Sequence, residues 1–251
     1  MSASNKNHFS IKNILFDSIN ITWEKRNELI KALALPVLLL VSIWAINWIL
    51  YDEQLELVDW ILWVVDGAAF CIFAVTCHRL ILTKEDIPTF RNILTKREFK
   101  FMLWSAAVYI ILLIINALIL NIMLNIPIIS ELYKTDGIEN YYVRLAISVP
   151  VLYFLARLCL IFPGTAVDAA VSIKWSWKNT RLYQFKIFVV IAIYPFIISW
   201  ILWWLTREDA FLIEQVLTSL LFYVGFALEV IALSLTYNFI INGNDDGVLD
   251  A

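Results

Sequence analysis

Six long apolar stretches constrain this chain more than any other feature of its sequence. A helix needs about 20 mostly apolar residues to cross about 30 Å of hydrocarbon, and each stretch reaches that length. Their apolar residues are continuous rather than alternating, which favours helices over the strands of a membrane barrel. We therefore predict an all-α polytopic membrane protein, a bundle of six transmembrane helices with short amphipathic helices on its cytoplasmic side. The predicted spans are 32–51, 57–81, 101–130, 145–167, 187–206 and 215–244.

The composition excludes several classes of protein. Hydrophobic residues make up 61% of the chain, whereas soluble domains contain about 45–50%. Charged residues make up 16%, against about 25% in an average domain. These values exclude a soluble globular enzyme, a disordered tail and a disulfide scaffold. The three cysteines all fall inside predicted spans, so we expect no structural disulfide.

Lysine and arginine predict the orientation of the spans, because short loops rich in these residues stay in the cytoplasm. They gather in segments 1–31, 79–100 and 157–186. The opposite side carries only three of them, beside acidic loops: Lys134, Arg144 and Arg207. We therefore expect both termini to be cytoplasmic.

The segment before the first span has an amphipathic pattern. Within 10–23, one face of a predicted helix carries Ile11, Ile14, Leu15 and Ile19, which is the spacing of a surface helix. Such a helix would lie flat on the cytoplasmic leaflet or pack over the cytoplasmic mouth of the bundle. We divide the chain into a cytoplasmic amphipathic arm, a six-helix transmembrane domain and an acidic cytoplasmic tail: 1–28, 29–244 and 245–251.

The cytoplasmic entries of the three predicted hairpins resemble one another. Each basic segment ends in a lysine at the mouth of an odd-numbered span: Lys31, Lys100 and Lys186. An asparagine follows sixteen residues later in the first two copies, at Asn47 and Asn116, but not in the third. Three pseudo-repeated hairpins are one interpretation. The other is that membrane-entry segments are commonly basic and aromatic.

Four ionisable residues stand out inside or at the ends of predicted spans, where a charge is costly and indicates a function by default. Asp66 lies near the middle of the second span and Arg79 at its inner end. Arg157 and Glu229 lie in the inner halves of the fourth and sixth spans, and pairing would keep both charged. We take these four as candidates for binding a lipid or a solute. A purely structural ion pair is the alternative, and Asp66 has no predicted partner.

No pattern in the sequence indicates catalysis. There is no glycine-rich phosphate loop, no nucleophile elbow and no metal-ligand spacing, and His8 and His78 are the only histidines. We therefore expect no enzymatic activity, no cofactor and no metal. The basic residues are spread over membrane-entry loops and the net charge is −3, so we expect no nucleic acid partner.

One stretch contains an Arg-Leu-x-Leu-x-x-Pro at the end of a span, then an acidic residue, then a Ser-Trp-x-x-Thr-Arg segment that opens the next span. Its residues are Arg157, Pro163, Asp168, Ser176, Trp177, Thr180 and Arg181. This stretch resembles a signature of bacterial YciC-like multi-pass membrane proteins, which also occurs in the membrane domain of some glycerophosphodiester phosphodiesterases. The resemblance implies an integral protein of the bacterial inner membrane. It does not imply phosphodiesterase activity, because that chemistry belongs to a separate soluble barrel.

The same motif also has an architectural interpretation. Pro163 can end or kink the fourth span. Asp168 suits the N-terminus of a following short helix, and Ser176 or Thr180 can cap the next helix.

We consider three functions for the chain. The first is a non-enzymatic inner-membrane protein that binds lipid or another amphiphile, in the bundle or at its cytoplasmic face, with anionic membrane lipids on the cytoplasmic side as partners. The second is a transporter or channel for a small solute. The third is a structural or partner-binding subunit of an envelope assembly, and the sequence does not name a protein partner.

Overall fold

The computed structural model describes residues 9–50, 56–83, 95–136, 141–205 and 212–242. The described residues form helices joined by short turns, with no strand among them. The N-terminal half contains α1 Ile11–Glu24, α2 Arg26–Leu50, α3 Glu56–Leu82, α4 Lys96–Leu124 and α5 Pro127–Asp136. The C-terminal half contains α6 Tyr141–Leu158, α7 Ile161–Ala166, α8 Ile173–Asn179, η4 Arg181–Tyr183, α9 Gln184–Phe188, η5 Val189–Ile193, α10 Tyr194–Leu205 and α11 Leu212–Asn242.

Five helical segments are long and apolar enough to cross a membrane, which indicates a multi-pass membrane protein. They are Trp60–Leu82, Lys96–Leu124, Val143–Ala166, Arg181–Ile201 and Leu221–Ile241. The first predicted span, 32–51, falls mostly within α2, but part of it lies outside the described residues. A membrane crossing by 32–51, and with it a total of six spans, therefore stays a prediction, as do the threefold repeat and the orientation of the termini. The tail 245–251 also lies outside the described residues.

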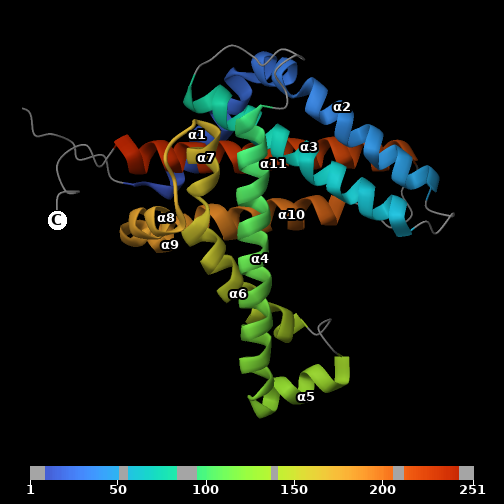
Figure 1. The fold of residues 1–251 in the computed structure, drawn as a ribbon, viewed down its shortest axis with the longest axis vertical. Coiled ribbons are helices and arrows are strands. Elements are labelled where there is room, and N and C mark those ends of the chain that lie inside the picture. The colour runs from blue at the N-terminus through green and yellow to red at the C-terminus, as the bar shows by residue number, and fades with distance from the viewer. Residues whose placement is uncertain (1–8, 51–55, 84–94, 137–140, 206–211, 243–251) are drawn as a thin grey trace, which may run out of the picture.

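The spans converge at one end and diverge at the other (Figure 1). The C-terminal end of α3, the N-terminal end of α4, the end of α6 and the C-terminal half of α11 meet around α7. Away from this junction, α4 runs steeply across α10 and α11, so the spans do not share one axis as the predicted bundle implies (Figure 1). The core lies at the junction. Half of the most apolar stretch of α11 is buried inside the protein, whereas only 6% of the corresponding stretch of α4 is buried.

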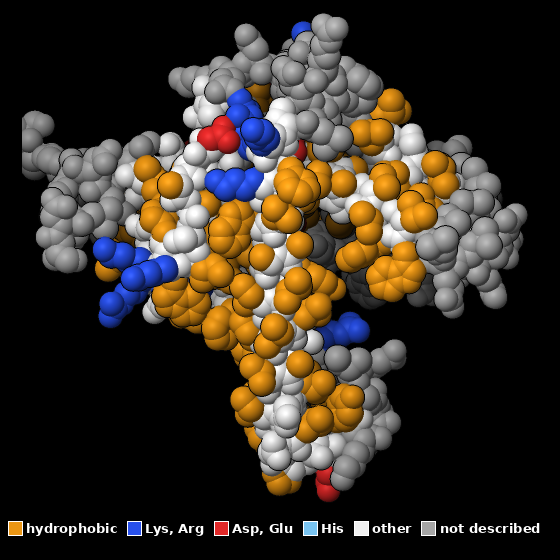
Figure 2. Space-filling view, viewed as in Figure 1, with side chains coloured by type: hydrophobic (Ala, Val, Ile, Leu, Met, Phe, Trp, Pro, Cys, Tyr) orange, Lys and Arg blue, Asp and Glu red, His pale blue; other side chains and the backbone are white. Residues whose placement is uncertain are grey.

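The exposed surface of α4 is apolar along most of its length (Figure 2). Leu103, Ile110, Leu113 and Leu118 are each about half exposed. A surface of this kind is stable in hydrocarbon and costly in water, which agrees with the identification of α4 as a span. Acidic and basic side chains instead gather around the N-terminal end of α4 (Figure 2).

Helix α1 packs against α11 rather than standing apart as an arm. Its residues Ile14 and Ser18 are buried, whereas Phe16 and Trp23 remain exposed. Only Lys25 separates α1 from α2. The contact of α1 with α11 agrees with packing on the bundle, whereas the position of α1 relative to the cytoplasmic leaflet stays a prediction.

The chain between α6 and α8 differs from what the motif predicted. The fourth span breaks at 159–160, and Pro163 lies within α7, in its first turn, where no intrahelical N–H is required. Helix α8 is capped by Ser172, whose hydroxyl accepts from the N–H of Trp175 at 3.1 Å. Ser176 therefore lies inside α8 and does not cap it. Thr180 is the N-cap residue of η4, but its hydroxyl makes no capping hydrogen bond there, so neither side chain has the predicted capping role.

Candidate functional site

Four residues of the family-like motif meet where α6 ends against α8. The Ser176 hydroxyl donates to the carbonyl oxygen of Arg157 at 2.9 Å. The Thr180 hydroxyl donates to the carbonyl oxygen of Ser176 at 2.8 Å and also lies 3.4 Å from that of Arg157. Because α6 ends at Leu158, the Arg157 carbonyl is one of the last four in the helix and has no partner within it. The two buried hydroxyls supply that partner.

The Arg157 side chain is held by Trp177. The residue is 2% exposed, its Nη2 donates to the carbonyl oxygen of Trp177 at 2.6 Å, and its guanidinium carbon lies 4.5 Å from the centre of the Trp177 ring. Nε and Nη1 are buried and have no hydrogen-bond partner in the structure. The predicted pairing with Glu229 is therefore wrong, since depth along two helices does not determine which way their side chains face.

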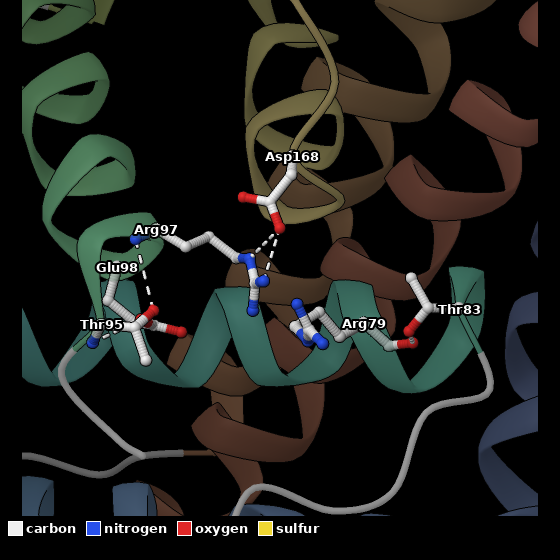
Figure 3. Close-up of polar contacts among 6 residues, drawn as sticks. All are labelled: Arg79, Thr83, Thr95, Arg97, Glu98 and Asp168. Atoms are coloured by element: carbon white, nitrogen blue, oxygen red, sulfur yellow. Dashed lines mark hydrogen bonds and ion pairs between the residues drawn. The ribbon is translucent and has the colours of Figure 1, made fainter.

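A second polar cluster joins α4 to the turn after α7 (Figure 3). Arg97 donates to the Asp168 carboxylate through Nε at 2.7 Å and through Nη2. Asp168 adopts a φ of 59°, a left-handed conformation that Asp tolerates better than most residues. Asp168 pairs with Arg97, whereas the predicted interaction of its carboxylate with the N-terminus of α8 is not formed, because Ser172 caps that helix. The hydrogen bond from Arg97 is the main reason that the pKa of the Asp168 carboxyl lies below its ordinary value, and the positive charges of Arg97, Arg79 and Lys100 lower it further.

Residues of α3 and of the start of α4 complete this cluster. Thr95 and Glu98 form a capping box at the start of α4, which fixes the first turn that carries Arg97. Arg79, near the end of α3, lies within electrostatic range of Arg97, Glu98 and Asp168. Arg79 was a candidate for lipid or solute binding, and the structure places it in this partly buried polar cluster.

The other two ionisable candidates lie elsewhere. Glu229 is half-buried on α11 within electrostatic range of Tyr194. Asp66 is half-buried on α3 within electrostatic range of Tyr223. The four predicted residues therefore do not form one site, and they line no common cavity in the part of the chain that the structure describes.

A groove that the sequence did not predict lies between α1, α2, α3 and α11. Its volume is about 760 Å³, within the range of about 300–1,000 Å³ that is usual for small-molecule sites. Trp23 of α1 lies at one end and Phe73 of α3 forms part of the floor. The walls come from α2 and α11 and are almost entirely apolar: Leu29, Ile30, Ala34, Val37, Tyr223, Val224, Ala227 and Leu228. The only feature of the sequence that pointed to this groove was the apolar face of α1. That face includes Ile14, which the core buries, and also Ile19, which remains exposed and lines the groove.

Polar groups gather at the α1 end of the groove. Asn20, Glu24 and Arg26 line it there. Arg26 donates through Nη1 to the Trp23 carbonyl oxygen at 2.9 Å, and its guanidinium carbon lies 5.0 Å from the centre of the Trp23 ring. The groove is therefore largely apolar, and its few polar residues, from α1 and the start of α2, include both an acid, Glu24, and a base, Arg26.

Nothing in the described residues resembles a catalytic or metal centre. No group of three His, Cys, Asp or Glu side chains among them is placed to hold a metal ion. His78 is fully buried, and its Nδ1 lies 2.7 Å from the Ser234 hydroxyl, so it joins α3 to α11. No family model, curated protein or solved structure matches this chain. The resemblance to YciC-like proteins therefore stays a prediction.

Proposed function

We propose that this protein binds a membrane amphiphile in the groove between α1, α2, α3 and α11. The observation that carries the proposal is the groove itself, whose lining is largely apolar and includes the guanidinium of Arg26 together with Glu24. The acyl chain lies along Ala34, Val37 and Val224, and the polar head lies beside Arg26. A guanidinium suits the phosphate or carboxylate of such a head group.

The proposal places the protein in the bacterial inner membrane with both termini in the cytoplasm. The α1 end of the groove then lies at the cytoplasmic surface, where Arg26 and Lys25 meet anionic lipids. The activity that we propose is non-enzymatic, because binding alone accounts for a largely apolar groove.

The geometry supports this function better than the two alternatives. Transport would need Asp66, Arg157 and Glu229 along one pathway. In the structure these residues have different neighbours, which are Tyr223, Trp177 and Tyr194 respectively. A subunit of an envelope assembly needs a partner surface, and no feature of the described residues favours one over the surrounding lipid.

The test is retention of lipid by the purified protein, measured by native mass spectrometry. Ala34→Trp fills the groove from an exposed position of α2, so it blocks the ligand without disturbing the core. Ala106→Trp makes the same change at an exposed position of α4, outside the groove. We expect wild type and Ala106→Trp to carry a lipid adduct that Ala34→Trp loses. Equal retention by all three proteins would contradict the proposal.

A further inference from the structure

The Arg157 guanidinium is a buried cation with most of its donors unused. Its Nε and Nη1 together carry three N–H groups, and both atoms are buried without a hydrogen-bond partner. An unpaired buried charge is strongly unfavourable, and native proteins pair such groups with an acceptor. The one acceptor that the guanidinium contacts is the neutral carbonyl oxygen of Trp177. The arrangement therefore lacks an anion.

The chain around Arg157 supplies no carboxylate. Between residues 145 and 205 the only acidic residue is Asp168, which is engaged by Arg97 on α4. The same stretch contains five basic residues: Arg157, Lys174, Lys178, Arg181 and Lys186. Of these, Lys186 donates to the Phe9 carbonyl oxygen at 2.6 Å, whereas Lys174, Lys178 and Arg181 are exposed. A cluster of cations without acids attracts an anion from outside the chain.

The surroundings of Arg157 also suit an oxyanion. Arg181, at the start of η4, acts on Arg157 electrostatically from the exposed side. Tyr153, one turn earlier on α6, brings a hydroxyl to the same side, where it donates to Gln184 at 2.9 Å. The Trp177 ring lies over the guanidinium, 4.5 Å from its central carbon, and is itself 39% exposed, so one partly exposed side chain lies between this face of the guanidinium and the surface.

We propose that Arg157 and Arg181, with Trp177 as the cover, form a binding site for a phosphate-bearing anion. A phosphate group carries several acceptor oxygens, and guanidinium groups bind them well. The source is either the head group of an anionic lipid or a free phosphate. The site uses α6, α8 and η4, whereas the groove uses α1, α2, α3 and α11, so each can fail without the other.

The test compares wild type with Arg157→Lys, which keeps the charge but removes Nε and the guanidinium fork. The backbone carbonyl that Ser176 and Thr180 contact is unchanged in this variant. Arg144→Lys makes the same substitution at the opposite end of α6, on an exposed residue, and serves as the matched control. Native mass spectrometry in micelles with equal amounts of phosphatidylglycerol and phosphatidylcholine measures the lipid source. Thermal unfolding in sodium phosphate, against sodium chloride of equal ionic strength, measures the soluble source.

We expect wild type and Arg144→Lys to bind one of these probes about tenfold more tightly than Arg157→Lys, the loss expected for charge-assisted hydrogen bonds. Selective retention of phosphatidylglycerol assigns the site to a lipid head group. Stabilisation by inorganic phosphate alone assigns it to a soluble anion. Equal behaviour of wild type and Arg157→Lys with both probes would overturn the proposal. If Arg157→Lys does not fold, wild type decides: no preference for phosphatidylglycerol and no effect of phosphate would overturn it.

Discussion

Gly164 lies where α7 makes its tightest contact. A Cβ atom at this position would lie 2.3 Å from Cγ1 of Val171 and 3.3 Å from Cε2 of Tyr237 on α11. Since carbon atoms in contact are about 3.5–4.0 Å apart, Val171 must move by about 1 Å or more to accept Gly164→Ala. Overpacking of this kind costs about 1–3 kcal/mol.

The control is Gly67→Ala, because a Cβ at Gly67 meets nothing within 4 Å. Both glycines lie in helices, so both variants gain about 1 kcal/mol from the restricted unfolded chain. This common gain cancels in the comparison, and the free energy of unfolding of Gly164→Ala should be lower than that of Gly67→Ala by about 1–3 kcal/mol.

Reversible unfolding in mixed micelles of sodium dodecyl sulfate and a mild detergent measures both variants. Val171→Ala removes the clashing methyl group, so in the double variant it should restore most of the loss caused by Gly164→Ala, which is a favourable coupling between contacting residues. If Gly164→Ala is as stable as Gly67→Ala, the close approach of α7 to the 169–172 turn and α11 is not present in solution, and the reasoning is refuted.

Two further predictions concern the polar contacts at the junction. Asp168→Asn keeps the side-chain shape and tolerates the positive φ, but it weakens the hydrogen bonds from Arg97. The folded-state pKa of Asp168 lies below its ordinary value, so wild type should be more stable than the variant above about pH 4. This difference in stability should disappear as the pH falls through the folded-state pKa of Asp168. Thermal unfolding across pH measures the difference, and a difference that does not change with pH would contradict the ion pair. Ser176→Ala should lower the free energy of unfolding by about 1–2 kcal/mol, because the Arg157 carbonyl oxygen then keeps only the 3.4 Å contact with the Thr180 hydroxyl. The control is Ser42→Ala, at an exposed hydroxyl on α2, which should change the free energy of unfolding by about 0.5 kcal/mol or less.

The membrane class could be predicted from the sequence, because the length and composition of an apolar run are local properties. Five of the predicted spans correspond to helices in the structure. The divergence of α4 from α10 and α11 could not be predicted, since apolar periodicity does not give the angle between two helices. The burial of α1 against α11 depends on contacts between residues more than 200 positions apart, and the amphipathic pattern left it open.

The candidate site was predicted in part. The motif singled out Arg157, Ser176, Trp177 and Thr180, and the structure brings these four together. Their bonds could not be predicted, because they depend on α6 ending one residue after Arg157 and leaving its carbonyl unpaired. The pairing of Arg157 with Glu229 rested on depth alone and ignored rotation about the helix axis. The groove combines four helices that are distant in sequence, and no single segment indicates it.

The most direct test of the central claim is to map where a bound lipid lies. A photoactivatable phosphatidylglycerol with a diazirine on its acyl chain is incorporated into nanodiscs with the protein, crosslinked, and located by peptide mass spectrometry. We expect adducts concentrated on residues 19–37 and 223–228, and their loss in Ala34→Trp while Ala106→Trp retains them. Adducts spread evenly over the exposed face of α4 and unchanged by Ala34→Trp would show that lipid only surrounds the protein, and would contradict the amphiphile groove.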